Sequence, residues 1–103
     1  MKVLWSNRAE RGLRQVEEYM LNEFGEDTRS KFMSEVEHIS YLLETSPEIG
    51  NLDSLFARHQ IAYRSIVIHR LSKLVYYIKG DSIHIAAFWD TRREPKKQAG
   101  KLK

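Results

Sequence analysis

The sequence predicts an α+β fold in the order β-α-α-β-β-β, with a helical hairpin packed on one face of an antiparallel sheet. Two long segments repeat their apolar residues at spacings of three and four, which is typical of amphipathic helices. Three later segments are rich in β-branched and aromatic residues, as strands are. Because helices and strands are segregated along the chain, the hairpin should cover one face of the sheet. The other face is then left to water or to a partner.

The first elements are a short strand over residues 3–5 and a helix that ends at Gly25. Asn7 is expected to cap the helix, because Glu10 lies three residues on and can reach back to the cap amide. Glycine is the common residue just past the end of a helix. The helix presents one apolar face, made of Ala9, Leu13, Val16, Met20 and Phe24.

A second helix is expected to begin at Asp27 or Thr28 and to end before Pro47. Its apolar residues again share one face, and they are Phe32, Val36, Ile39 and Leu43. Only a few residues separate the two periodic segments. The two helices should therefore form an antiparallel hairpin.

Residues 47–60 form a connector, and strands are predicted over residues 61–68, 74–79 and 83–89. Gly80-Asp81 suits a tight hairpin turn between the last two strands, and residues 69–72 can make the other turn. Three consecutive strands joined by short turns form an antiparallel meander. We expect one domain over residues 1–95 and a basic, flexible C-terminal tail over residues 96–103.

The length and composition exclude several classes of protein and of site. The chain has 103 residues and a mass of 12.2 kDa, enough for one small hydrophobic core. It contains no cysteine, which excludes disulfides, thiolate zinc sites and cysteine nucleophiles. No apolar run resembles a signal peptide or reaches the length of a membrane span. The absence of cysteine is also consistent with a reducing compartment.

Charge is unevenly distributed along the chain. The formal net charge is +3, but residues 1–53 carry 6 basic and 11 acidic side chains, and residues 54–103 carry 11 basic and 3 acidic ones. The first half is therefore at −5 and the second at +8. The acidic charge falls on the predicted helices, and the basic charge falls on the strands and tail. This predicts a basic surface that docks a polyanion or an acidic protein segment.

Arg64 is a cation inside an otherwise apolar strand. Strict alternation puts Arg64 on one face with Ala62, Ile66 and Ile68, and puts Ile61, Tyr63, Ser65 and Val67 on the other. One interpretation is an arginine on the open face of a half-exposed sheet, whose stem covers apolar surface. The other is a rigidly held functional cation. The sequence leaves both open.

Three other strand residues are candidates for chemistry. Tyr76 and Tyr77 are neighbours, so one is core and the other is exposed for stacking or hydrogen bonding, and the sequence does not say which. His84 lies on the last strand, where it could share a surface with Arg64 and act as a general base.

Basic residues follow the last strand. Arg92 and Arg93 come directly after it, and Lys96 and Lys97 continue the basic run. They suit phosphates or an acidic partner, although a solvated basic terminus is the more common explanation of such residues. No metal-ligand spacing, glycine-rich phosphate loop or nucleophile motif is found in the sequence, so no metal or cofactor is expected.

An ordered set of short motifs resembles the RelE/ParE family, the toxins of type II toxin–antitoxin systems of the plasmid stabilisation type. The resemblance extends over residues 5–95. Its motifs are Ser46-Pro47-Glu48-Ile49-Gly50, Ala62-Tyr63-Arg64-Ser65, Leu74-Val75-Tyr76-Tyr77-Ile78, Ile83-His84-Ile85 and Asp90-Thr91-Arg92-Arg93-Glu94-Pro95. The resemblance implies a compact α+β fold with a curved antiparallel sheet. It also implies a cytoplasmic growth inhibitor that a cognate antitoxin neutralises in a hetero-oligomer.

Activities divide within this family. RelE-like members cut messenger RNA on the ribosome, and ParE-like members act on DNA gyrase. For a nuclease, the resemblance implies a metal-independent site in which Arg64, Arg92 and Arg93 neutralise the phosphodiester and His84 or Tyr77 assists as the base. However, no tyrosine or histidine follows Arg93, so the general acid or base of the nuclease members has no counterpart there.

That departure favours a ParE-like inhibitor of DNA gyrase, whose target would be bound by Arg64, Arg92, Arg93, Lys96 and Lys97. The alternatives are a RelE-like messenger RNA endoribonuclease (an mRNA interferase) and a non-toxic binding module of the same fold. The sequence leaves open the target and whether the chain is an enzyme.

Overall fold

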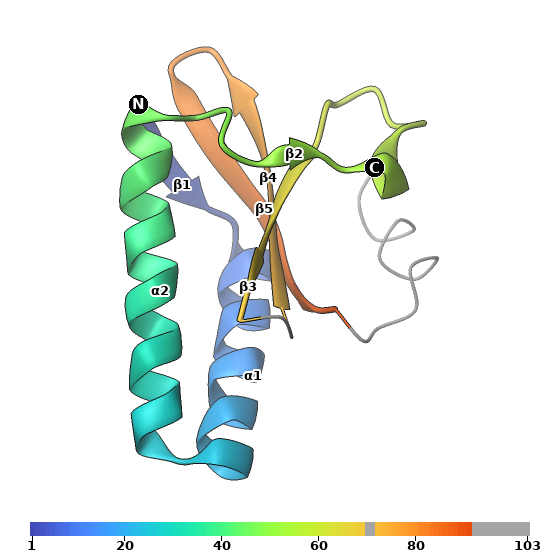
Figure 1. The fold of residues 1–103 in the computed structure, drawn as a ribbon. Helices are drawn as coiled ribbons and strands as arrows, with labels where there is room; N and C mark the ends of the chain where they lie inside the picture. The colour runs from blue at the N-terminus through green and yellow to red at the C-terminus, as the bar shows by residue number, and fades with distance from the viewer. Residues whose placement is uncertain (70–71, 92–103) are drawn as a thin grey trace.

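Two helices pack against one side of a five-stranded sheet in the computed structural model, which describes residues 1–69 and 72–91 (Figure 1). The helices are α1 (Asn7–Phe24) and α2 (Glu26–Thr45). Gly25 alone joins them, at a φ of 92° that favours glycine. The predicted hairpin is confirmed, and α2 begins one residue earlier than expected.

The cap of α1 differs from the prediction. Ser6 is the N-cap, and its hydroxyl accepts a hydrogen bond of 3.0 Å from the backbone N–H of Ala9. Asn7 is already the first helical residue, so the prediction of an Asn7 cap was wrong. The Ser6 hydroxyl also donates a hydrogen bond to the carbonyl oxygen of Ala86, and this bond links the start of the helix to the sheet.

The strands are β1 (Lys2–Trp5), β2 (Asn51–Leu52), β3 (Arg64–Ile68), β4 (Ser72–Lys79) and β5 (Ser82–Asp90), in the spatial order β1-β5-β4-β3-β2. The meander of β3, β4 and β5 is antiparallel, as predicted. β1 instead pairs parallel with β5, so the sheet is mixed and not wholly antiparallel. The predicted strand over residues 61–68 begins only at Arg64.

The main core lies between the sheet and the two helices. The largest buried side chains here come from both layers and include Met20, Phe32, Leu43, Ile68, Leu74, Tyr76, Ile83, Ile85 and Phe88. The helix side of the sheet is therefore closed by the apolar faces that the helical spacing predicted.

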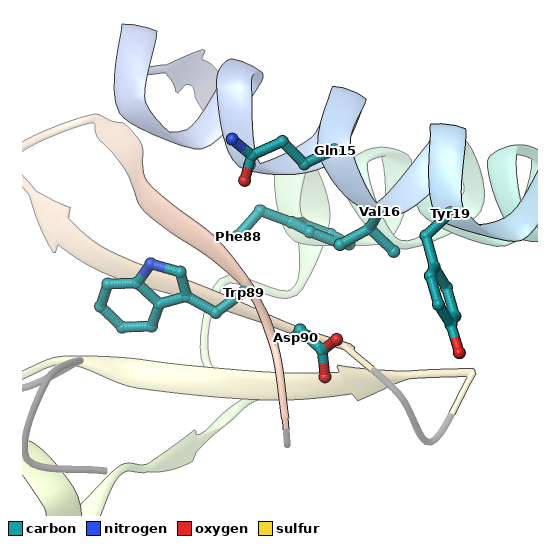
Figure 2. Close-up of a pocket in the computed structure, with 7 residues that line it drawn as sticks. Gln15, Val16, Tyr19, Phe88, Trp89 and Asp90 are labelled. Carbon is teal, nitrogen blue, oxygen red and sulfur yellow. The ribbon is translucent and has the colours of Figure 1, made fainter. Parts of the chain in front are cut away.

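The two layers approach most closely where α1 crosses β5. A Cβ added at Gly12 would lie 2.0 Å from the carbonyl oxygen of Phe88, so only glycine fits. A hollow of about 210 Å³ adjoins this contact and is lined by Gln15, Val16 and Tyr19 of α1 with Phe88, Trp89 and Asp90 of β5. Figure 2 shows Phe88 directed toward α1 and Trp89 directed to the other side of the strand.

The face of the sheet away from the helices is only partly covered. A 3₁₀ turn, η1 (Ser54–Phe56), places Phe56 against Val75, Ala87 and Trp89 in a second apolar cluster. Lys73 Nζ donates to Asp53 Oδ2 at 2.8 Å and lies 5.4 Å from the centre of the Phe56 ring. This ion pair fixes the connector over one half of the face.

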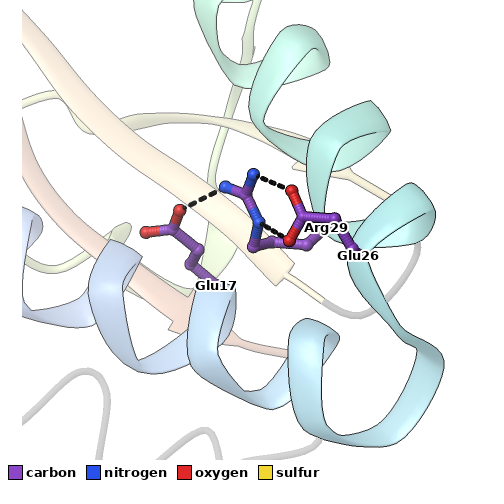
Figure 3. Close-up of polar contacts among 3 residues, drawn as sticks. All are labelled: Glu17, Glu26 and Arg29. Carbon is purple, nitrogen blue, oxygen red and sulfur yellow. Dashed lines mark hydrogen bonds and ion pairs between the residues drawn. The ribbon is translucent and has the colours of Figure 1, made fainter.

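An ion-pair group joins the two helices near the hairpin turn (Figure 3). Arg29 donates from Nη1 to Glu17 Oε2 at 2.8 Å and also binds the carboxylate of Glu26. The hydrogen bond from Arg29 lowers the pKa of Glu26, and the two carboxylates raise that of Arg29. All three side chains are at least partly exposed, so the group orients the helices more than it stabilises them.

In the part of the chain that the structure describes, no helix is long and apolar enough to cross a membrane. The predicted boundary between a domain ending at residue 95 and a basic tail over residues 96–103 lies outside the described residues and stays a prediction.

Candidate functional site

Arg64 lies on the helix side of the sheet, directly opposite Tyr76 on β4. Its Nη1 donates to the carbonyl oxygen of Gly50 at 2.8 Å and to that of Glu48 at 3.5 Å. The guanidinium therefore supports the turn that follows α2. The interpretation of Arg64 as an arginine on the face away from the helices was wrong, because its side chain lies on the helix side and is half-buried. A functional role of Arg64 stays a prediction.

Tyr76 contacts the same turn after α2, and its side chain is fully buried. Its hydroxyl donates to the carbonyl of Pro47 at 2.7 Å and accepts from the N–H of Gly50 at 2.9 Å. Burial raises the pKa of Tyr76, with the Gly50 hydrogen bond and the charge of Arg64 acting in the opposite direction. A Cβ added at Gly50 would lie 2.8 Å from the Tyr76 hydroxyl, so the turn requires glycine at this contact.

Tyr77 is the half-exposed member of the tyrosine pair and lies on the opposite face, which we call the open face. It is paired in register with His84 on β5, and the two rings stack with centroids 4.9 Å apart and an interplanar angle of 7°. Tyr63 contacts Tyr77 at right angles, at 5.7 Å. The predicted shared surface of His84 and Arg64 was wrong, because strand alternation puts the two side chains on opposite faces of the sheet.

A bulge in the β4–β5 pairing shapes this part of the open face. The register shifts between Val75 and Tyr76, where Val75 pairs with Ala87 and Tyr76 with Ile85. Ala86 is the extra residue, and both alanines pack with the open-face cluster. Ala87 is fully buried, whereas the half-buried Ala86 lines a hollow in the surface here.

This hollow is part of a groove of about 420 Å³, which we call the open-face groove. Tyr63, Tyr77, His84 and Ala86 contribute from the sheet side. The rest of the lining consists of Leu4 and Trp5 of β1, Ser6, Arg8 and Arg11 at the start of α1, Ile61 of the connector and Ile85 of β5.

Arg8 and Arg11 are the charged residues of the groove, and no acidic residue is among the described residues that line it. Both are exposed and lie in the first turns of α1. Burial raises the pKa of Tyr63, and the nearby charge of Arg8 opposes that rise. Arg8 and Arg11 were not predicted as site residues, because in the sequence they belong only to the polar side of an amphipathic helix.

The basic side chains of the structure do not form the surface of basic strands and tail that the sequence predicts. Arg92, Arg93, Lys96 and Lys97 lie outside the described residues. Among the described strand residues, Lys73 is engaged by Asp53 and Arg64 by the turn. The basic side chains of the groove come from the half of the sequence that is acidic overall. No group of three histidine, aspartate or glutamate side chains in residues 1–69 and 72–91 is arranged to hold a metal ion.

No protein-family model and no curated protein matches the sequence. Among solved structures, a chain of "Chromosomal ParDE TA system from P. aeruginosa" matches with a TM-score of 0.67 and 17% sequence identity. The match covers 87% of this chain and 95% of that chain. It confirms the α+β fold that the family resemblance implied.

Proposed function

We propose that this chain is the toxin of a type II toxin–antitoxin pair, that it inhibits growth through DNA gyrase, and that a cognate antitoxin neutralises it. The observation that carries the proposal is the fold match, which extends over nearly the whole length of both chains. A partner-binding toxin also needs an uncovered surface, and the open-face groove supplies one.

The choice of gyrase over messenger RNA rests on where the candidate nuclease residues lie. Metal-free cleavage of RNA needs a cation on the phosphate and a base at the 2′-hydroxyl, both at the same reacting centre. Arg64 is directed to the carbonyls of Gly50 and Glu48 on the helix side, whereas Tyr77 and His84 stack on the open face. A mechanism that acts by binding alone does not require these groups to converge.

A RelE-like endoribonuclease is the second candidate, and one observation favours it. His84 and Tyr77 lie beside Arg8 and Arg11 on the same face, so a base and a cation are present in one groove. In that case His84 or Tyr77 would assist the attack, and the arginines of α1 would take the phosphate in place of Arg64. Arg92 and Arg93, and with them Lys96 and Lys97, keep their predicted role in target or RNA binding under either candidate.

Expression of the chain without its antitoxin tests the proposal. Growth should stop, a reporter of the DNA-damage response should switch on, and primer extension on a translated message should show intact RNA. Cuts placed by ribosome position would instead establish the endoribonuclease. Unimpaired growth at a verified level of folded protein would leave a non-toxic binding module of this fold.

A further inference from the structure

The two edges of the sheet differ in length. β2 forms one edge and has two residues, whereas β1 forms the other and has four. Proteins prevent their edge strands from pairing with other chains by keeping them short or by placing a proline or a bulge in them. β1 contains no proline, and its register with β5 is continuous. No strand of the described chain pairs with the outer edge of β1, so this edge can accept a further strand.

The backbone groups of Val3 and Trp5 face this outer edge. The N–H groups of Lys2 and Ser6 donate toward β5, to carbonyl oxygens at residues 81 and 85, at 3.2 and 3.0 Å. Alternate residues of a strand direct their backbone groups to opposite sides, so those of Val3 and Trp5 point away from β5. Two residues of β1 therefore present both a donor and an acceptor outward.

β1 is held in place at both of its ends. The Met1 ammonium group donates to the carbonyl oxygen of Glu44 at 2.7 Å, and the Ser6 hydroxyl donates to that of Ala86 at 3.0 Å. The strand is thus ordered before any partner arrives, and pairing at its edge requires little further loss of conformational entropy.

We infer that β1 pairs antiparallel with β1 of a second copy of this chain, in a two-fold symmetric dimer centred on Leu4. In this register Val3 of each copy lies opposite Trp5 of the other, and each such pair exchanges two backbone hydrogen bonds. All the outward donors and acceptors of both residues are then satisfied. Lys2 lies opposite Ser6 of the second copy, so no like charges are directly opposed.

The side chains of β1 suit a second copy of the same strand. On the helix side, Val3 and Trp5 pack against the main core, and a β-branched residue opposite an aromatic one is a favourable cross-strand pair. On the open face, Leu4 is 41% exposed, and the symmetry axis places the two Leu4 side chains against each other. A two-fold interface requires a self-complementary surface, and this strand supplies one.

The dimer has a defined arrangement of faces. A two-fold axis between antiparallel strands of one sheet is perpendicular to that sheet, so both open faces lie on one side of the dimer and all the helices lie on the other. Leu4 also lines the open-face groove, so the two grooves flank the axis. The pairing involves β1 alone and is independent of the proposed function.

Cross-linking through a single cysteine tests the register directly, because the chain contains no cysteine of its own. In the full chain with Leu4→Cys, the two thiols face each other across the axis. The Cα atoms of such a pair are about 4.5 Å apart, within the range that a disulfide spans. Mild oxidation should therefore give a disulfide-linked dimer on a non-reducing gel.

Leu52→Cys and Val67→Cys are the matched controls. Both positions are more exposed than Leu4, and neither lies on β1. Each should cross-link at least about tenfold more slowly than Leu4→Cys, since only Leu4 is placed on the symmetry axis.

Sedimentation equilibrium tests the dimer without a covalent bond. The mass of the wild-type chain should rise from that of a monomer to that of a dimer as the concentration increases. Val3→Pro removes an outward N–H that β5 does not use, and proline is tolerated on an edge strand in this orientation. It should raise the dissociation constant of the dimer at least about tenfold. Val3→Ala is the control, because it shortens the same side chain and keeps the N–H.

Three results would overturn the inference. They are a wild-type chain that stays monomeric at the highest concentration, three cysteine variants that cross-link at equal rates, and a dimer that Val3→Pro does not weaken. Circular dichroism verifies the fold of each variant, and the cysteine comparison decides if Val3→Pro fails to fold. A chain that dimerises in this way and does not arrest growth would contradict the proposed function alone.

Discussion

The two faces of the sheet carry similar residue types in different surroundings. On the helix side, Arg64 and Tyr76 direct their polar atoms at the backbone of the turn over residues 47–50. On the open face, Tyr77 and His84 stack at a groove whose arginines are exposed. An arginine and a tyrosine therefore stabilise the fold on one side, whereas the same residue types line a groove on the other side.

The difference shows that residue type does not decide between structure and function at these positions. Tyr76 and Tyr77 are adjacent in sequence, and only the side of the sheet separates a fully buried hydroxyl from a half-exposed one. Substitutions on the helix side should therefore reduce stability, and substitutions in the groove should reduce binding at nearly constant stability.

The largest effect is expected from Gly12→Ala, because the new methyl group would lie 2.0 Å from the backbone oxygen of Phe88. α1 must then move away from β5, at a cost of about 3 kcal/mol or more in the free energy of unfolding. The better helix propensity of alanine returns only about 1 kcal/mol. Since α1 also carries Arg8 and Arg11, this helix-side change should disturb the groove as well.

Urea unfolding measures this effect, and Gly80→Ala is its control. Gly80 has no neighbour within 4 Å of an added Cβ and carries only the strain of its φ of 59°, so about 1 kcal/mol is expected there. A Gly12→Ala variant as stable as the wild type would contradict the close approach of α1 to β5.

The adjacent tyrosines provide the sharpest test of the two faces. Tyr76→Phe removes a buried hydroxyl that makes two hydrogen bonds, and should lower the free energy of unfolding by about 2–3 kcal/mol. Tyr77→Phe removes a hydroxyl from a half-exposed ring and should change it by less than about 0.5 kcal/mol. Equal losses in the two variants would contradict the assignment of faces.

The titration of Asp53 tests whether its ion pair with Lys73 secures the connector over one half of the open face. Burial disfavours its charge, but hydrogen bonds from Lys73, from the N–H of Leu55 and from Ser65 outweigh burial and hold the pKa of Asp53 below its ordinary value of 3.8. The group therefore stabilises the fold fully above pH 3.8, and this contribution is lost as the pH falls through the lower pKa of the folded state.

Asp53→Asn should accordingly cost about 1–2 kcal/mol near neutral pH and progressively less as the pH falls below 3.8, when unfolding curves of the two proteins are compared from pH 7 to pH 2. Comparison with the wild type isolates this carboxylate from the others that titrate in acid. A difference that stays constant from pH 7 to pH 2 would show that the Asp53 charge is not what secures the connector.

Arg64→Ala carries a smaller expected loss of stability, about 1–1.5 kcal/mol, because the guanidinium is partly exposed and its partners are carbonyls. Growth inhibition should fall only as far as the amount of folded protein falls. If thermal unfolding is unchanged and growth inhibition disappears, Arg64 acts on the target and the division between the faces is wrong.

Local patterns predicted the elements well and their pairing less well. Spacings of three and four residues identified both helices, and β-branched runs identified the meander. The parallel pairing of β1 with β5 joins residues some eighty positions apart, and no local pattern encodes it. The Ser6 cap depends on that pairing, because its hydroxyl also donates to Ala86.

The candidate site was predictable only in part. Alternation correctly separated Tyr76 from Tyr77, but the choice of core residue depends on the bulge and on where the helices pack. Arg8 and Arg11 could not be found from the sequence, since their distinction lies in their place beside β1 and the rings of β4 and β5. The charge of each half of the chain predicted a basic surface but not which residues form it.

A supercoiling assay with purified chain and purified DNA gyrase tests the central claim most directly. If the chain inhibits gyrase, relaxed plasmid should stay relaxed as the wild-type chain is added. Normal supercoiling at a large excess of correctly folded chain would contradict the account.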